Sequence, residues 1–329
     1  MSGNLSEHGL INALFAPLAA PGGLGLLDDA ALLKPSPGYE IVMTVDAIVS
    51  GVHFLHDDNP GDVACKALGV NLSDLAAKGA EPLGFLLSLG VNDAWSQDWI
   101  ATFARGLGAV STQWRCPLYG GDTVRAVGAP FISITALGEV PEGKMVRRNG
   151  ANVGDYICVS GTIGDAALGL FLARGDEPAW ATSLSNADWQ LLIMRYHRPQ
   201  PRIALAPFVR NYATAAMDLS DGLIGDMEKL LKASGVSAEV TLENVPLSQA
   251  ARNALSNDAT CLDTIMCGGD DYEILCTVSP ASYTKVVTTA AAAGVEFHRI
   301  GTVTEGQETP SYSYNGKPVQ FAKPSFSHF

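Results

Sequence analysis

The sequence predicts a protein of two domains, each built from α+β or α/β layers. The chain has 329 residues, and a domain commonly has about 150 residues. Hydrophobic residues make up 47% of the chain and charged residues 17%, which is enough apolar material for two packed cores. Strand-like and helix-like segments alternate along both halves, which is typical of layered folds that contain both elements.

The first half begins with an apolar segment over residues 10–20, which predicts an amphipathic first helix. Residues 40–45 predict a short buried strand that ends at Asp46. Pro60 is suited to the first position of a helix, and Gly79 is suited to its end. We therefore expect a long helix between these two residues.

This long helix carries an apolar face with polar side chains along its edge. The apolar positions recur at helical spacing and are Ala64, Leu68, Leu72 and Leu75. Asn71, Asp74 and Lys78 form the polar stripe beside them. A carboxylate at the edge of a buried face is held rigidly yet stays open to a ligand, so Asp74 is a candidate site residue. Lys66 and Lys78 are expected to be solvated.

Residues 131–140 predict another strand, and the loop-like stretch at 145–153 predicts the domain boundary. We therefore expect an N-terminal domain over 1–145 and a C-terminal domain over 146–329. The later elements are expected as strands at 156–160, 215–219, 236–242, 272–278 and 296–300, and as helices at 165–173, 222–233 and 281–293.

Composition excludes several classes of partner. The formal net charge is -13, and a strongly acidic protein repels nucleic acid and anionic membranes. The six cysteines are scattered without C-x-x-C spacing, which indicates reduced thiols and a cytoplasmic protein, with neither a zinc site nor a disulfide framework. No uncharged apolar run approaches the roughly 18 residues that a membrane span needs.

Acidic residues recur at expected strand ends and in glycine-containing turns. Magnesium prefers oxygen ligands and is commonly held by one or two carboxylates together with substrate phosphates. Any one such acid more often closes a turn or caps a helix; Asp271 is expected to bond local backbone, and Asp165 to cap a helix. The set as a whole is Asp28, Asp29, Asp46, Asp74, Asp122, Asp218, Asp221, Asp270 and Asp271.

Two short motifs occur twice. Leu72-Ser73-Asp74 recurs as Leu219-Ser220-Asp221, and Gly120-Gly121-Asp122 recurs as Gly268-Gly269-Asp270. Two matches of this length do not establish an internal duplication. They indicate that both halves carry an acid beside small residues.

The ordered set of motifs resembles the thiamine-monophosphate kinases, within the superfamily of aminoimidazole ribonucleotide synthetase. The segment from Lys66 to Ala77, Lys-Ala-Leu-Gly-Val-Asn-Leu-Ser-Asp-Leu-Ala-Ala, is the most specific match. The others are Asp28-Asp29-Ala30-Ala31, Asp46 with Gly51-Val52-His53-Phe54, Gly120-Gly121-Asp122-Thr123, Arg148 before Gly150-Ala151, Gly154-Asp155, Gly161-Thr162, Asp218-Leu219-Ser220-Asp221-Gly222-Leu223 and Gly268-Gly269-Asp270-Asp271-Tyr272-Glu273.

The resemblance implies a two-domain fold like that of aminoimidazole ribonucleotide synthetase, and a homodimer. The N-terminal domain would form the dimer through its sheet and carry most metal ligands, while a layered α/β C-terminal domain would complete the ATP and substrate site. Several Mg²⁺ ions are implied at Asp29, Thr44, Asp46, Asp74, Asp122, Asp218 and Asp221. ATP is implied at Gly121, Asp122, Arg148 and Ser220, and thiamine monophosphate at His53 and Asp270.

The implied reaction is ATP-dependent phosphorylation of thiamine monophosphate to thiamine diphosphate. The second ionisation of a phosphate monoester has a pKa near 6, so the attacking phosphate is already an anion and needs no general base. Metal ions and Arg148 would neutralise and align the two anions for a direct in-line transfer. Asp46, Asp74, Asp122 and Arg148 are therefore the expected catalytic residues.

The sequence departs from the family pattern at three places. Leu27 stands where a glycine usually precedes the paired acids. Val45 replaces a usual threonine, and a metal contact there would use the backbone carbonyl. No tryptophan follows Trp189, so the family's late tryptophan against the thiamine ring is absent, and Phe321 is the candidate substitute, with Phe326 behind it.

Other functions remain open from sequence alone. Another phosphotransferase or synthetase of the superfamily would keep the metal motifs. However, selenophosphate synthetase needs an N-terminal reactive Cys or selenocysteine, and the hydrogenase-maturation relative needs a C-terminal cysteine. A carboxylate–metal phosphohydrolase would release phosphate without ATP. A non-enzymatic protein would bind MgATP without turnover.

Overall fold

The structure is a computed structural model that describes residues 6–325, and it divides into two compact units. The first unit comprises the chain up to Leu75 together with Ala80–Gly143. The second comprises Ala76–Gly79 together with the chain from Lys144 onward. No helix within residues 6–325 is long and apolar enough to cross a membrane.

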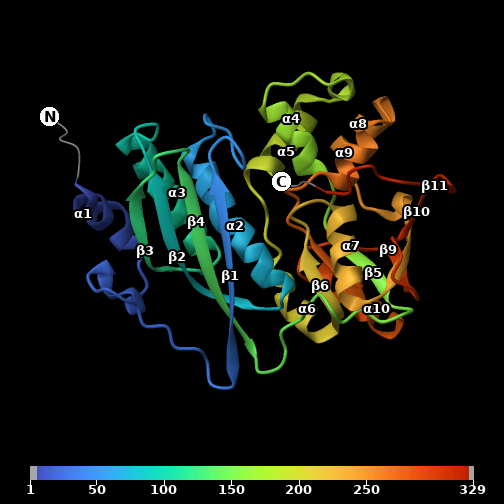
Figure 1. Cartoon of the computed structure of the whole chain (residues 1–329), viewed down its shortest axis with the longest axis horizontal. Coiled ribbons are helices and arrows are strands. Elements are labelled where there is room, and N and C mark those ends of the chain that lie inside the picture. The colour runs from blue at the N-terminus through green and yellow to red at the C-terminus, as the bar shows by residue number, and fades with distance from the viewer. Residues whose placement is uncertain (1–5, 326–329) are drawn as a thin grey trace. The chain divides into compact units, whose positions relative to one another are not determined.

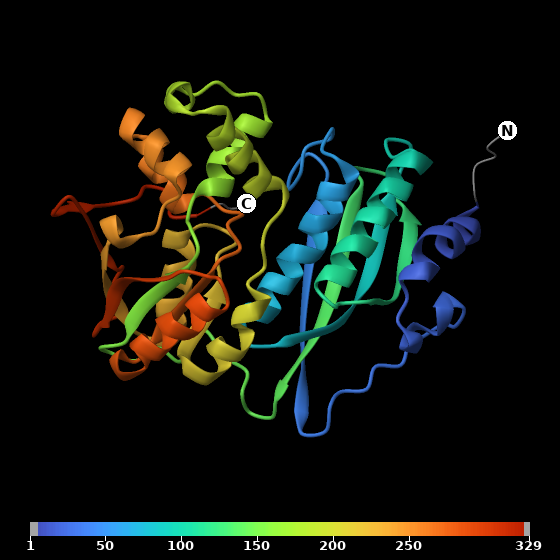
Figure 2. The same cartoon turned by 180° about the vertical axis from the view of Figure 1, so that it is seen from behind.

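The first unit is a four-stranded sheet with two helices on one face (Figures 1 and 2). The strand order is β1-β4-β2-β3, with β1 and β2 antiparallel to β4 and β3 parallel to β2. The elements are α1 (Glu7–Leu10), β1 (Tyr39–Val49), α2 (Pro60–Ala77), β2 (Glu81–Val91), α3 (Gln97–Gln113), β3 (Leu118–Arg125) and β4 (Phe131–Pro141).

The two faces of this sheet differ in burial. Along β1, Val42 and Ile48 are buried, whereas the alternate residues Met43 and Val45 have exposed fractions of 69% and 60%. Since successive side chains of a strand point to opposite faces, one face packs beneath α2 and α3 and the other face is open. We call the second the open face.

The single helix expected over residues 10–20 is not formed. α1 ends at Leu10, a wider helical turn covers Ile11–Phe15, and a 3₁₀ turn covers Ala16–Leu18. Pro17 and Pro21 explain the difference, because proline lacks the backbone N–H that a continuing α-helix would use. The expected strands and long helix of this unit are present. α2 is close to its predicted range, whereas β1 extends beyond the predicted residues 40–45 to Val49.

The second unit is a seven-stranded mixed sheet covered on both faces. The strand order is β11-β10-β7-β9-β5-β8-β6. The strands are β5 (Tyr156–Ser160), β6 (Ala213–Asp218), β7 (Ser237–Thr241), β8 (Ile274–Val278), β9 (Phe297–Thr304), β10 (Ser311–Tyr314) and β11 (Lys317–Val319). The helices are α4 (Asp165–Ala173), α5 (Asn186–His197), α6 (Ala206–Tyr212), α7 (Leu223–Ser234), α8 (Gln249–Asn257), α9 (Cys261–Cys267) and α10 (Pro280–Ala292).

Each face of this sheet has its own apolar core. The larger core joins β5 and β6 to α4, α5, α7, α8 and α9. The smaller core joins the other face to α6 and α10 and includes Ala76 and Ala77 from the end of α2. A sheet buried on both faces explains why β8, Ile-Leu-Cys-Thr-Val, is buried at every position. The α+β, two-domain fold class predicted from the sequence is confirmed.

Two lysines differ from expectation. Lys66 is only 2% exposed, and the Lys78 ammonium donates a hydrogen bond to the Ala216 carbonyl oxygen at 2.7 Å. The prediction that both are solvated is therefore wrong. Long lysine side chains can bury their methylene stems along an apolar surface when the ammonium group reaches a polar partner.

Candidate active site

A polar junction in the first unit joins β1 to α2. The Thr44 hydroxyl donates to Asp74 Oδ2 at 2.5 Å, and the Asp46 backbone N–H donates to Asn71 Oδ1 at 3.0 Å. Asn71 is fully buried and donates its own amide to the Ala67 carbonyl oxygen. The polar stripe predicted on α2 thus holds the middle of β1, and it places Thr44, Asp46 and Asp74 at one junction. The expectation that the strand ends at Asp46 is wrong, because β1 continues to Val49 through its pairing with β4.

Asp122 lies on the opposite face of the same sheet. The register pairs Asp122 with Ser88 on β2, Ser88 with Ser133 on β4, and Ser133 with Ala47 on β1. Paired residues share a face, so Asp122 lies on the open face together with Ala47, and the neighbouring Asp46 side chain points to the helix-covered face.

A cavity of about 640 Å³ lies beside β3 and is lined by Asp28, Asp29, Gly121 and Asp122, among other residues of the first unit. Asp28 accepts a hydrogen bond from the Asp29 backbone N–H, and Asp122 accepts one from the Thr123 backbone N–H, both at 2.8 Å. These acids are exposed, so their carboxylates are available to a ligand.

Glycine is required at position 121 by the close approach of β2 and β3. A Cβ atom there would lie 1.8 Å from the Leu87 carbonyl oxygen. The glycine of the Gly-Gly-Asp motif therefore allows the two strands to pair tightly just before Asp122. Leu27, which stands where the family has glycine, has φ of -106°, which any residue adopts; the positive φ of this turn falls on Leu24 and Leu26 instead.

The acids of the first unit therefore form two groups, one at the β1–α2 junction and one at the open face. Within residues 6–325, no group of three or more His, Cys, Asp or Glu side chains is placed to hold a metal ion. The donor set nevertheless suits magnesium, since each group offers hard carboxylate oxygens and this ion commonly uses one or two carboxylates with phosphate and water.

His53 lies in a tight turn after β1. Its Nδ1 accepts a hydrogen bond from the Val49 backbone N–H at 3.1 Å, so the neutral ring carries its proton on Nε2. The Gly51 N–H donates to the Phe54 carbonyl oxygen, and the Ser50 hydroxyl hydrogen-bonds to His56 Nδ1 at 2.8 Å. This turn fixes both the orientation and the tautomer of His53.

In the second unit, Asp218 ends β6 and the turn after it is held by Asp226. Asp226 is fully buried and its Oδ2 accepts hydrogen bonds from the backbone N–H groups of Ser220 and Asp221 at 3.0 and 2.9 Å. Burial raises the pKa of the Asp226 carboxyl, although the Lys229 ammonium acts in the opposite direction. Lys229 also lies 2.6 Å from Asp221 Oδ2, so Asp221 already has a cationic partner.

The two motifs of the second unit lie side by side. The Asp270 N–H donates to the Ser220 carbonyl oxygen, the Tyr272 N–H donates to the Leu219 carbonyl oxygen, and the Leu219 N–H donates to the Glu273 carbonyl oxygen, at 2.8–2.9 Å. Ser220 and Asp270, expected to bind ATP and thiamine monophosphate respectively, are therefore joined directly through backbone hydrogen bonds.

The repeated tripeptides do not share a local structure. Leu72-Ser73-Asp74 lies inside α2, whereas Leu219-Ser220-Asp221 follows strand β6. Gly120-Gly121-Asp122 lies within strand β3, whereas Gly268-Gly269-Asp270 is a loop after α9. The two halves thus use the same short sequences in different elements.

Arg148 and Phe321 lie in the second unit. Arg148 is exposed, and its carbonyl oxygen accepts a hydrogen bond from the Ser234 hydroxyl. Phe321 is half-buried with its ring edge-on to Tyr312, at 5.6 Å between centroids. Phe326 lies outside the described residues.

Comparison with known proteins identifies the family of the chain. The model of the family described as "AIR synthase related protein, N-terminal domain" matches residues 27–140, and that described as "AIR synthase related protein, C-terminal domain" matches residues 152–312. A thiamine-monophosphate kinase of Caulobacter vibrioides is 42% identical over 98% of this chain and 91% of that protein. The chain belongs to the thiamine-monophosphate kinase family.

Solved structures agree with this kinase family. The crystal structure of thiamine-monophosphate kinase from Stenotrophomonas maltophilia aligns with a TM-score of 0.79 at 39% identity, covering 89% of this chain and 91% of that chain. AaThiL, solved in complex with AMPPCP and TMP, aligns with a TM-score of 0.77 at 30% identity, covering 99% of this chain and 97% of that chain.

Three residues that hold the loops at Ser220 and Asp270 were not predicted from the sequence. Asp226 and Lys229 hold the turn at Ser220, and Glu273 was noticed only as part of a motif. The sequence does carry a signal for Asp226, since it lies in the first turn of the helix that follows Asp221-Gly222. An acid at this position can accept hydrogen bonds from backbone N–H groups that have no partner within the helix. No local signal marks Glu273, whose partners lie 71–113 residues away.

Proposed function

We propose that this chain transfers the γ-phosphate of ATP to thiamine monophosphate and so produces thiamine diphosphate. One observation carries the proposal: the chain is 42% identical to a thiamine-monophosphate kinase over almost its full length. The geometry supports it, since the loop that carries Ser220 and the loop that carries Asp270 are hydrogen-bonded to each other.

The chemistry needs little from a protein base or nucleophile. The substrate phosphate is ionised at neutral pH and can attack directly. Burial raises the pKa of the Cys116 and Cys158 thiols to about 12, so neither is a thiolate that could accept a phosphoryl group. We therefore propose direct in-line transfer without a phosphoenzyme, which an already ionised phosphate acceptor supports.

Magnesium fits the acidic positions by the chemistry of their donors. When bound, it would supply charge neutralisation for the triphosphate and hold the reacting groups in line. The chain's own part is to hold its acids in place: at the β1–α2 junction the Thr44 hydroxyl holds the Asp74 carboxylate, and Asn71 holds the backbone of Asp46. The proposed metal positions are Asp29, Thr44, Val45, Asp46, Asp74, Asp122, Asp218 and Asp221.

The remaining site residues also follow the family pattern. We assign ATP contacts to Gly121, Asp122, Arg148 and Ser220, and thiamine monophosphate contacts to His53, Asp270 and Phe321. Asp46, Asp74, Asp122 and Arg148 are the proposed catalytic residues. The hydrogen bond from the Val49 N–H supports the role of His53, because it fixes the orientation of the ring.

Chromatographic detection of thiamine diphosphate tests the activity. We expect product when the protein is mixed with thiamine monophosphate, ATP and magnesium, and none when ATP is omitted or EDTA is added. Phosphate released without ATP would instead support a phosphohydrolase. Binding of MgATP by folded protein without product would contradict the proposal and favour a binding protein.

We propose further that two copies of the chain pair through the open face of the first unit's sheet. The exposed apolar side chains Met43 and Val45 support this, because an exposed apolar patch commonly marks an interaction surface. The six cysteines, none of which forms a disulfide, support a reducing, cytoplasmic location.

Met43→Glu is expected to convert the dimer to a monomer, because a carboxylate would have to be buried against the apolar face of the second copy. Light scattering after size-exclusion chromatography measures the mass. Met145→Glu, at an exposed methionine of the second unit (41% exposed), is the matched control and should stay dimeric. A monomeric wild type would refute the pairing.

A further inference from the structure

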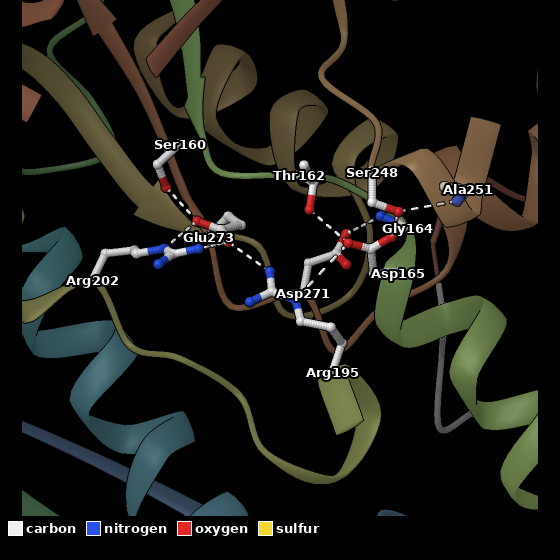
Figure 3. Close-up of polar contacts among 10 residues, drawn as sticks. All are labelled: Ser160, Thr162, Gly164, Asp165, Arg195, Arg202, Ser248, Ala251, Asp271 and Glu273. Carbon is white, nitrogen blue, oxygen red and sulfur yellow. Dashed lines mark hydrogen bonds and ion pairs between the residues drawn. The ribbon is translucent and has the colours of Figure 1, made fainter. Parts of the chain in front are cut away.

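Asp271 lies inside the second unit, where the loop over residues 268–273 meets the start of α4 (Figure 3). Its side chain is only 4% exposed. Asp271 Oδ2 accepts a hydrogen bond from the Gly164 backbone N–H at 2.8 Å, 107 residues away in the sequence. The expectation that Asp271 bonds only local backbone is therefore wrong. Asp271 Oδ1 is buried and has no hydrogen-bond partner within residues 6–325.

The two arginines near Asp271 form ion pairs with Glu273 instead. Figure 3 shows Arg195 and Arg202 converging on Glu273. Arg195 Nη2 and Arg202 Nε donate to Glu273 at 2.7 and 2.6 Å, and the Ser160 hydroxyl donates at 2.6 Å. Glu273 is fully buried, so this group satisfies its own charge internally.

Asp165 is the other acid that faces the cluster. It accepts hydrogen bonds from the hydroxyls of Thr162 and Ser248 at 2.6 and 2.5 Å, and Arg195 Nε lies 3.9 Å from it. It is the first residue of α4 rather than its cap, since Gly164 occupies the cap position. The expectation of a capping role for Asp165 is corrected accordingly.

The charges of the cluster balance only when one acid is neutral. Arg195 and Arg202 offset Glu273 and Asp165, and neither guanidinium hydrogen-bonds to Asp271 among the described residues. A third buried anion with a single neutral donor would be costly, and a buried acid avoids this cost by keeping its proton. In agreement, burial raises the pKa of the Asp271 carboxyl well above its ordinary value, against smaller opposing effects of the Gly164 N–H and Arg195.

The backbone on either side of Asp271 is in an unusual conformation. Asp270 has φ of 74° and Tyr272 has φ of 50°, a region that costs free energy for residues other than glycine. Such a conformation persists only when neighbouring contacts hold it. Here the contacts are the backbone hydrogen bonds to Leu219 and Ser220 and the hydrogen bond of the Asp271 side chain with the Gly164 N–H.

We propose that Asp271 is a positioning residue for thiamine monophosphate, holding the Asp270–Tyr272 loop through a neutral carboxyl group. The proposal rests on the proposed function of Asp270 as a substrate contact. Asp271 itself touches no reacting atom; it fixes the backbone from which Asp270 projects.

Asp271→Asn tests whether the group is neutral, because asparagine has the shape of the protonated acid but cannot ionise. We expect its KM for thiamine monophosphate and its kcat to stay within about 3-fold of wild type at pH 7. Asp271→Ala should raise this KM about 10-fold or more, with little change in kcat or in the KM for ATP. An Asn variant as impaired as the Ala variant would overturn the proposal.

Thermal unfolding against pH provides a readout that needs no activity. The native state binds the Asp271 proton more tightly than the unfolded state, so this group's contribution to wild-type stability falls as pH rises from the unfolded pKa near 4 toward the raised native value. The Tm of Asp271→Asn relative to wild type should therefore rise as the pH is raised above 5. A constant difference would show that Asp271 is ionised throughout.

The two measurements separate this inference from the proposed function. Wild-type protein that forms no thiamine diphosphate would refute the function, and with it the role toward the substrate, while the unfolding series would still report on the neutral carboxyl. Active wild-type protein with an impaired Asn variant would refute only the role of Asp271.

Discussion

Asp74→Asn is expected to lower kcat/KM for thiamine monophosphate phosphorylation by about 100-fold or more while leaving the fold intact. Loss of one charge that organises a phosphoryl-transfer site typically has an effect of this size. The amide oxygen of asparagine can still accept the Thr44 hydroxyl hydrogen bond that Asp74 accepts at 2.5 Å, so the β1–α2 junction should survive. Steady-state kinetics at saturating magnesium measures the loss, and thermal unfolding checks the fold.

Asp93→Asn is the matched control for this variant. The Asp93 side chain is 98% exposed and lies 3.7 Å from Arg125, in the same unit but outside the acidic groups. It should keep wild-type activity. Full activity in the Asp74 variant would remove Asp74 from the proposed metal positions.

Glu273→Ala is expected to cause the largest loss of stability. Removal of this carboxylate leaves two arginines, Arg195 and Arg202, whose side chains are only 9% and 17% exposed, without their main counterion. Breaking a buried ion pair by removing one partner typically costs about 3–5 kcal/mol. Denaturant unfolding followed by circular dichroism measures the change in the free energy of unfolding.

Two further variants sharpen this test. Glu296→Ala removes an exposed acid, 3.2 Å from His298 with its side chain 83% exposed, and should change stability by well under 1 kcal/mol. Glu273→Gln keeps hydrogen-bond acceptors but not the charge, so it should fall between the two. A Glu273→Ala protein as stable as the Glu296→Ala protein would contradict the importance of the buried cluster.

The parts of the fold that the sequence predicted are those with regular apolar spacing and clear ends. β5 and α4 match their predicted ranges, Tyr156–Ser160 and Asp165–Ala173. α3 was not predicted, although its signals are present: Ser96 caps the helix by accepting a hydrogen bond from the Trp99 N–H, and Ile100, Phe103 and Leu107 recur on its buried face.

Strand β2 could not be predicted because its glycines serve contacts with distant residues. A Cβ atom at Gly90 would lie 2.0 Å from the Phe131 ring, and one at Gly84 would lie 2.3 Å from the Tyr119 ring. These glycines make room for aromatic side chains of neighbouring strands. Glycine is depleted in β-strands. The local sequence therefore disfavours a strand at β2, and the strand forms because its glycines fit against neighbouring strands.

The residues of the candidate site could be identified from the sequence, but their arrangement could not. The motif residues were identified by resemblance, since spacing alone left each acid as a turn or cap. The opposite faces of Asp46 and Asp122 depend on strand register, which no local pattern along β1 or β3 specifies. The partners of Glu273 and Asp271 come from β5, the N-cap of α4, α5 and the segment after α5, so these interactions exist only once the second unit has folded.

The loops at Ser220 and Asp270 are hydrogen-bonded to each other, and this pairing would couple the two substrates at the contacts proposed above. A shift of one loop on ligand binding would be transmitted to the other through these bonds. ATP at Ser220 would then tighten the binding of thiamine monophosphate at Asp270, and linkage requires the reverse effect to be equal in size. The ternary complex would be favoured over either binary complex, which would protect ATP from unproductive hydrolysis before its acceptor is present.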